Sequence, residues 1–147
     1  MKAVLQNFKS GAMSIDSVPS PSLKPDGVLV TNVCSLVSAG TEKAVIEFAK
    51  MNSLKKAKER PDLVKKVLSK IGQDGLFTTA QIVNNLISSP LPLGYSCSGI
   101  VSEVGKNVSD LVPGQKVACA GLGYANHAQM VYVPRNLVVS LPTNLTF

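Results

Sequence analysis

One strand entry and one histidine carry the side chains of this sequence that are best suited to chemistry. The stretch LPLGYSCSGIVSEVG, residues 91–105, enters a strand through a glycine, with Tyr95, Ser96 and Cys97 at its mouth. Polar side chains gathered at such an entry raise the question of an active site. His127 is the single histidine of the sequence and follows a glycine-rich turn. A lone histidine there is more often a surface or hydrogen-bonded residue than a catalyst, and a proton carrier is the alternative.

The cysteines form no redox or metal motif. The sequence has three, Cys34, Cys97 and Cys119, and no two of them stand at C-x-x-C spacing. An odd number without that spacing argues against a disulfide framework and against a cysteine zinc knuckle. Each lies in an apolar segment, so we predict that they are buried small hydrophobic side chains rather than reactive thiols.

The segment GLGYAN, residues 121–126, resembles part of a dinucleotide-binding fingerprint. That fingerprint needs a tight turn followed by a helix whose N-terminus faces the pyrophosphate. The following residues, HAQMVYVP, read as a strand that ends in proline, and Asn126 stands where the last glycine would be. We therefore predict a glycine turn between two strands and no cofactor site at this segment.

The apolar pattern predicts a mainly β chain with a helical insertion (α+β). Residues 1–8 and 28–37 read as strands, and short strands recur at regular spacing after residue 93, which is typical of a small barrel or sandwich. From about 41 to 89 the period becomes helical. Thr41 is the expected N-cap, with Glu42 in the first turn. A short basic helical piece is expected over 53–60, and further helices over 61–72 and 75–89, the first with Pro61 at its N1 position.

The composition limits the classes of function. The 147 residues suffice for one domain with a core, and no apolar run approaches the ~18 residues of a membrane span. No signal-peptide pattern opens the chain, so we expect a cytoplasmic protein without a membrane partner. The net charge of +6 belongs to one segment, because eight of the fifteen Lys and Arg residues lie between 50 and 70. No aromatic residues interleave with them, so we favour a solvated helix face over nucleic-acid binding.

The order of the segments resembles the N-terminal, GroES-like catalytic domain of the medium-chain alcohol dehydrogenase/reductase superfamily. The matching pieces are MKAVL, PSPSLKPDGVLVTNV, SAGTE, PLGYSCSGIVSEVGKNVSDLVPGQKV and HAQMVYVPRNLVVSLP. The most specific is the run G-x-V-x-x-V-G-x-x-V-x-x-x-x-x-G-x-x-V from Gly99 to Val117. The resemblance implies a partly open β-barrel with peripheral helices over residues 1–147 that lines a substrate cleft. It also implies a separate Rossmann domain after Phe147 that supplies most of the NAD or NADP site.

The sequence departs from this family at the metal. Zinc-dependent members carry Cys-Gly-Thr/Ser-Asp and Gly-His-Glu segments, in which Cys and His bind the catalytic zinc. Here the first segment is Ala39-Gly40-Thr41-Glu42 and the second is Gly94-Tyr95-Ser96. Ala39 and Tyr95 thus stand where two zinc ligands would be, and the four-cysteine lobe is also missing. We therefore expect no bound zinc.

The resemblance assigns roles to the residues at these positions. Thr41 matches the hydroxyl that relays protons, and Glu42 matches the neighbouring carboxylate. Our hypothesis is that Tyr95, with Thr41, hydrogen-bonds the substrate oxygen in place of the metal, and that His127 carries a proton. Ser38 and Ser96, which adjoin the two lost ligand positions, are the expected substrate-binding residues.

The helical insertion narrows the resemblance further. It is similar to that of bi-domain oxidoreductases of bacterial polysaccharide biosynthesis, in which a dehydrogenase half is fused to a Gfo/Idh/MocA-type half. This implies a zinc-free, NAD(P)-dependent oxidoreductase acting on a small molecule such as a sugar or nucleotide-sugar. The alternative is a non-catalytic binding or scaffold domain whose Lys-rich helices dock an acidic partner.

Overall fold

The computed structural model describes residues 1–7, 10–51, 55, 58–59 and 61–147. The chain divides into two units. One comprises Met1–Leu5, Ser14–Glu42 and Pro92–Phe147, and the other comprises Gln6–Met13 and Lys43–Leu91. No helix among the described residues has the length and apolar character needed to cross a membrane.

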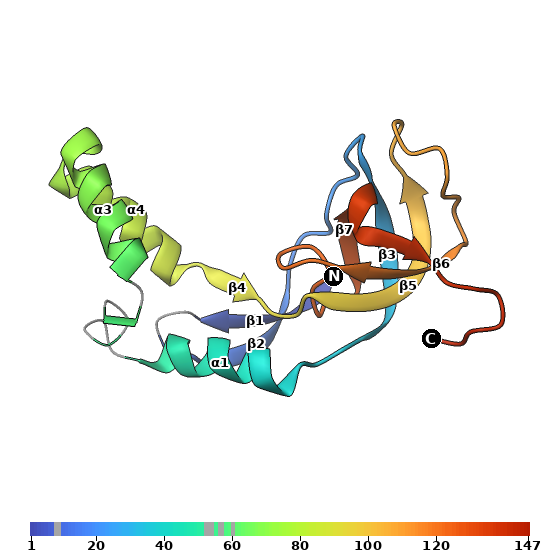
Figure 1. The fold of residues 1–147 in the computed structure, drawn as a ribbon, viewed down its shortest axis with the longest axis horizontal. Coiled ribbons are helices and arrows are strands. Elements are labelled where there is room, and N and C mark those ends of the chain that lie inside the picture. Colours follow the sequence, from blue (N-terminus) through green and yellow to red (C-terminus); the bar gives the residue numbers. More distant parts are fainter. Residues whose placement is uncertain (8–9, 52–54, 56–57, 60) are drawn as a thin grey trace. The chain divides into compact units, whose positions relative to one another are not determined.

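The larger unit is built on a five-stranded sheet with the strand order β7-β3-β5-β6-β8 (Figure 1). The strands are β3 (Gly27–Ser35), β5 (Ser96–Val104), β6 (Lys116–Ala120), β7 (Met130–Pro134) and β8 (Val138–Ser140). A 3-10 turn, η1 (Arg135–Leu137), joins the last two. Each pairing in this sheet is antiparallel. Antiparallel strands that curl around one apolar core account for the mainly β character predicted from the sequence.

A second sheet has three strands in the order β2-β1-β4. These are β1 (Lys2–Asn7), β2 (Met13–Ser17) and β4 (Pro90–Pro92). Only β1 was predicted. β2 is five residues that are exposed along their whole length, and β4 is three residues that begin and end with proline. A bridge between Ala3 and Ala128 ties β1 to the loop before β7.

The core of the larger unit lies on the inner face of its sheet. It is made mainly of valines, which suit a pleated, buried surface. Its members are Val28, Val30, Cys97, Val101, Val108, Leu111, Val117, Cys119, Ala125, Val131, Val133 and Val138. Three valines of the Gly99–Val117 run, Val101, Val108 and Val117, belong to this core, so that signature encodes packing.

The helical insertion is confirmed, with α1 (Ala39–Lys50), α3 (Pro61–Asp74) and α4 (Leu76–Ser88). Pro61 opens α3 as predicted, and Gly75, whose φ of 85° suits glycine, separates α3 from α4. The two helices pack against each other. The basic helical piece expected over 53–60 lies largely outside the described residues. Lys65, Lys66 and Lys70 on α3 are exposed, as a solvated face requires.

The start of α1 corrects the sequence prediction. The N–H of Glu42 donates to the C=O of Ser38 (2.9 Å), which makes Ser38, and not Thr41, the residue that caps the helix. The side chain of Glu42 turns back to accept from the Ser38 N–H at 3.1 Å. This return contact resembles half of a capping box, shifted by one residue.

Candidate functional site

Three side chains of the larger unit form a hydrogen-bonded chain. The hydroxyl of Ser35 lies 2.8 Å from Nδ1 of His127. The opposite ring nitrogen, Nε2, lies 3.2 and 3.1 Å from Oε1 and Oε2 of Glu42. The side chains of His127 and Glu42 are only 9% and 11% exposed, whereas Ser35 is exposed. The buried pair therefore has one polar end that reaches the surface, and that end is a hydroxyl.

The carboxylate fixes the roles of the two ring nitrogens. An ionised Glu42 only accepts, so Nε2 of His127 carries the hydrogen in this contact. In the neutral ring, Nδ1 is then the acceptor and the Ser35 hydroxyl is the donor. A proton on Ser35 thus has an acceptor 2.8 Å away, and that acceptor is oriented from behind by a carboxylate.

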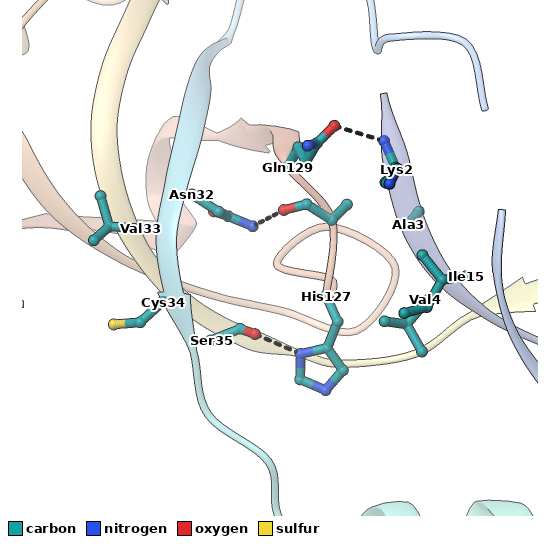
Figure 2. Close-up of a pocket in the computed structure, with 11 residues that line it drawn as sticks. Lys2, Ala3, Val4, Ile15, Asn32, Val33, Cys34, Ser35, His127 and Gln129 are labelled. Carbon is teal, nitrogen blue, oxygen red and sulfur yellow. Dashed lines mark hydrogen bonds between the residues drawn. The ribbon is translucent and has the colours of Figure 1, made fainter. Parts of the chain in front are cut away.

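A β-bulge brings Ser35 to this position. Asn32 pairs with Gly99 and Cys34 pairs with Ser98, so Val33 is an extra residue in β3. Without the bulge, residues 32 and 35 would face opposite sides of the strand, because side chains alternate. With it, both point towards the His127 loop, while Val33 and Cys34 point the other way (Figure 2). Gly99 permits the close approach, because a Cβ there would collide with the C=O of Thr31.

The loop that carries His127 is held on both sides. Nδ2 of Asn32 donates to the C=O of Asn126 (3.1 Å) and of Ala128 (2.7 Å). The N–H of His127 donates to the C=O of Leu93 at 2.8 Å, and its C=O accepts from the N–H of Val4 at 2.8 Å. Asn32 of β3 thus fixes the residues before and after His127. The backbone of His127 itself is fixed by Leu93 and by Val4 of β1.

Gly94 makes room for the imidazole. Its φ is 93°, and a Cβ there would lie 2.7 Å from the backbone N of His127 and 2.8 Å from Cγ and Nδ1 of the ring. A side chain at Gly94 would therefore be both strained and in collision. The glycine that the sequence pattern places before Tyr95 serves to seat the ring of His127.

A pocket of about 310 Å³ opens beside Ser35 and His127 (Figure 2). This volume lies at the lower end of the range of small-molecule sites. Polar groups on its wall come from Lys2, Asn32, Ser35, His127 and Gln129. Oε1 of Gln129 accepts from the backbone N–H of Lys2 at 2.7 Å, which ties the two sides of the pocket together.

The structure describes the other four predicted site residues as well. Among the described residues, no hydrogen bond joins their side chains to the cluster of Ser35, His127 and Glu42. Tyr95 is half-buried, and its C=O accepts from the N–H of Gly121 at 2.8 Å. Thr41 is exposed on the first turn of α1. Ser96 is half-buried at the start of β5. Ser38 hydrogen-bonds to the cluster, because its backbone N–H donates to Oε1 of Glu42. The assigned roles of these residues stay predictions.

The cysteine prediction is correct for two residues and wrong for one. Cys97 and Cys119 are buried directly opposite each other on β5 and β6. The hydrogen bond with Cys97, and then burial, raise the pKa of the Cys119 thiol, so it stays protonated at neutral pH. Cys34 is exposed, with its sulfur 3.0 Å from Oγ of Ser98. The bulge turns Cys34 away from the core, which the apolar surroundings in the sequence did not reveal.

The donor atoms do not fit a catalytic zinc, and the glycine turn does not fit the pyrophosphate of a dinucleotide. Ala39 offers no ligand, and the described part of the chain holds no cluster of three or more His, Cys, Asp or Glu side chains suited to a metal ion. Residues 121–126 form a turn between β6 and β7, as predicted, and no helix follows them. The fingerprint geometry for pyrophosphate is therefore missing at that turn.

This chain resembles known dehydrogenases and oxidoreductases, and each match covers less than half of the other protein's length. A segment of L-idonate 5-dehydrogenase of Vitis vinifera is 40% identical over 42 residues, which is 29% of this chain and 12% of that protein. The galactitol-1-phosphate dehydrogenase of Escherichia coli has the same fold, with a TM-score of 0.64 and 18% identity. So does the quinone oxidoreductase of Coxiella burnetii, with a TM-score of 0.63 and 17% identity. These alignments cover 99% and 100% of this chain but only 39% and 38% of those chains.

The family follows from the sequence match together with the fold. Residues 63–143 match the alcohol dehydrogenase GroES-like domain. The match includes the Gly99–Val117 signature and the core strands β5, β6, β7 and β8. This chain belongs to the alcohol dehydrogenase GroES-like domain family, within the medium-chain alcohol dehydrogenase/reductase superfamily.

Proposed function

We propose that this chain is the substrate-binding catalytic domain of a zinc-free, NAD(P)-dependent oxidoreductase. The observation that carries the proposal is the buried Glu42–His127 pair beside a pocket of about 310 Å³. An oriented imidazole that opens towards a small pocket suits proton transfer to or from a substrate oxygen. The hydride would pass between the substrate and a nicotinamide held by a second domain, which we place after Phe147.

The other site residues keep the roles proposed for them. Tyr95 and Thr41 would hydrogen-bond the substrate oxygen, and Ser38 and Ser96 would contact the rest of the substrate. We propose a sugar or nucleotide-sugar as the substrate, because the helical insertion resembles that of bi-domain oxidoreductases. We also propose a cytoplasmic enzyme with no membrane or nucleic-acid partner.

The proposal is tested by measuring enzymatic turnover of the protein expressed from its whole reading frame. Purified protein would be assayed with NAD⁺ or NADP⁺ against sugar alcohols and nucleotide-sugars, with elemental analysis for bound metal. We expect nicotinamide reduction without stoichiometric zinc. Absence of turnover with either nucleotide would favour the scaffold alternative, and one zinc per chain would overturn the zinc-free mechanism.

The role of Tyr95 has its own test in the same protein. Tyr95→Phe removes only the phenol oxygen, and loss of one oriented hydrogen-bond donor typically lowers kcat by about 10²–10³-fold. Tyr124→Phe is the matched control, because Tyr124 is exposed in the glycine turn. Equal activity of Tyr95→Phe and wild type would remove Tyr95 from the mechanism.

A further inference from the structure

Ser35 is the exposed end of the Ser35–His127–Glu42 chain, and the sequence pattern assigned it no role. Its hydroxyl lies on the pocket wall and contacts the imidazole at 2.8 Å. His127 and Glu42 are nearly closed to solvent. We infer that Ser35 is the catalytic hydroxyl through which the substrate exchanges its proton with this buried pair. The inference deepens the proposed function and rests on it.

The proton step balances without a metal. In alcohol oxidation, the substrate O–H gives its proton to Oγ of Ser35 while the Ser35 proton moves to Nδ1 of His127. The nicotinamide of the proposed second domain would supply the hydride acceptor for the same substrate carbon, so that the product would be a carbonyl. Glu42 stabilises the resulting imidazolium through Nε2, at 3.1–3.2 Å. Reduction of a carbonyl runs through the same steps in reverse.

The geometry distinguishes Ser35 from an ordinary strand hydroxyl. Ser102 also has a hydroxyl in a side-chain hydrogen bond, with Oγ1 of Thr31 at 2.7 Å. It is not among the pocket residues, however, and no hydrogen bond joins it to a titratable side chain of the part of the chain that the structure describes. Ser35 owes its place to the bulge at Val33, which turns it towards His127. A bulge that re-aims one side chain is common beside active sites.

The first experiment needs no cofactor. Ser35→Cys, in a Cys34→Ser background that avoids a disulfide between neighbours, places a thiol where the hydroxyl was. If His127 takes a proton from position 35, the thiol becomes a thiolate at neutral pH, whereas an ordinary thiol is a few per cent ionised. We expect iodoacetamide to alkylate it about tenfold or more faster than it alkylates exposed Cys34 of the wild-type chain.

A second variant isolates the imidazole. Adding His127→Gln should return the alkylation rate of the new cysteine to that of Cys34, with circular dichroism to confirm that the chain stays folded. A Ser35→Cys rate equal to that of Cys34 would overturn the inference. So would a fast rate that persists without His127, because the acceleration would then have another source.

Kinetics in the extended chain separate this inference from the proposed function. Ser35→Ala should lower kcat by about 10²-fold or more with little change in KM, and Ser35→Thr should restore most of the loss. Ser102→Ala should match wild type. If wild type turns over and Ser35→Ala equals it, the inference fails and the proposed function stands. If wild type shows no nicotinamide-dependent turnover, the proposed function fails.

Discussion

Replacing Gly94 with alanine is the sharpest test of how the site is built. The backbone of Gly94 has φ = 93°, outside the regions that L-residues favour, which costs alanine about 1–2 kcal/mol. The added Cβ would also lie 2.7 Å from the backbone N of His127 and 2.8 Å from two ring atoms. Relieving such an overlap in a packed site costs about 1–3 kcal/mol. The sum predicts a loss of about 2–5 kcal/mol in the free energy of unfolding.

Gly114→Ala supplies the matched control. Gly114 has φ = 87°, close to that of Gly94, but nothing lies within 4 Å of a Cβ there. This variant carries the backbone strain without the collision, so it should lose only about 1–2 kcal/mol. The difference between the two variants, about 1–3 kcal/mol, measures the contact with His127.

The assay combines denaturant unfolding with NMR of the single histidine. A folded Gly94→Ala chain should show shifted imidazole signals, because the ring must leave its place between Ser35 and Glu42. Gly114→Ala should leave those signals unchanged. Equal unfolding free energies for the two variants, or an unshifted imidazole in Gly94→Ala, would refute the packing described for Gly94.

Two further changes test the electrostatics and the core. Hydrogen bonds from the Arg135 guanidinium, Nε among them at 2.8 Å, lower the pKa of the Asp110 carboxyl. A carboxyl whose pKa is lowered by folding stabilises the protein above its unfolded pKa of about 3.9, and this contribution is lost as the pH falls through the folded value. The Tm of wild type should therefore fall more between pH 7 and about pH 2 than the Tm of Asp110→Asn. Equal falls in Tm would argue against the ion pair. In the core, Val101 is 1% exposed and Val139 is 68% exposed. Val101→Ala should cost about 2–3 kcal/mol in chemical denaturation and Val139→Ala less than about 0.5, so similar costs would contradict the core assignment.

The sequence predicted those parts of the fold that depend on local pattern. Pro61 and Gly75 mark the ends of α3, because one fits the first turn of a helix and the other adopts a positive φ. Val101 and Val117 belong to the core and lie on two of the short strands that the pattern predicted after residue 93. Each of these features is decided by neighbours in the sequence, so an apolar period or a breaker residue is sufficient to reveal it.

The site depends on features that no local pattern shows. The bulge at Val33 arises from how β3 pairs with β5, about 65 residues later, and it decides that Ser35 faces His127 and that Cys34 is exposed. The cap of α1 was misplaced at Thr41 because serine at 38 and threonine at 41 are both good caps. The hydrogen bond from the Glu42 N–H to the Ser38 C=O, and the return contact from the Glu42 side chain to the Ser38 N–H, distinguish them.

The same long-range contacts explain how this site can bury an acidic residue. Glu42 is buried, and a buried carboxylate is costly unless it is hydrogen-bonded and paired. His127 lies 85 residues along the chain from Glu42 and presents Nε2 to both of its oxygens. Removing one partner of such a buried pair typically lowers the free energy of unfolding by about 3–5 kcal/mol. The pair therefore holds the loop that carries His127 as strongly as a contact in the core would. Loss of either residue would therefore leave a buried polar group of the other unpaired, and the hydroxyl of Ser35 is the polar group that the pair presents to the pocket.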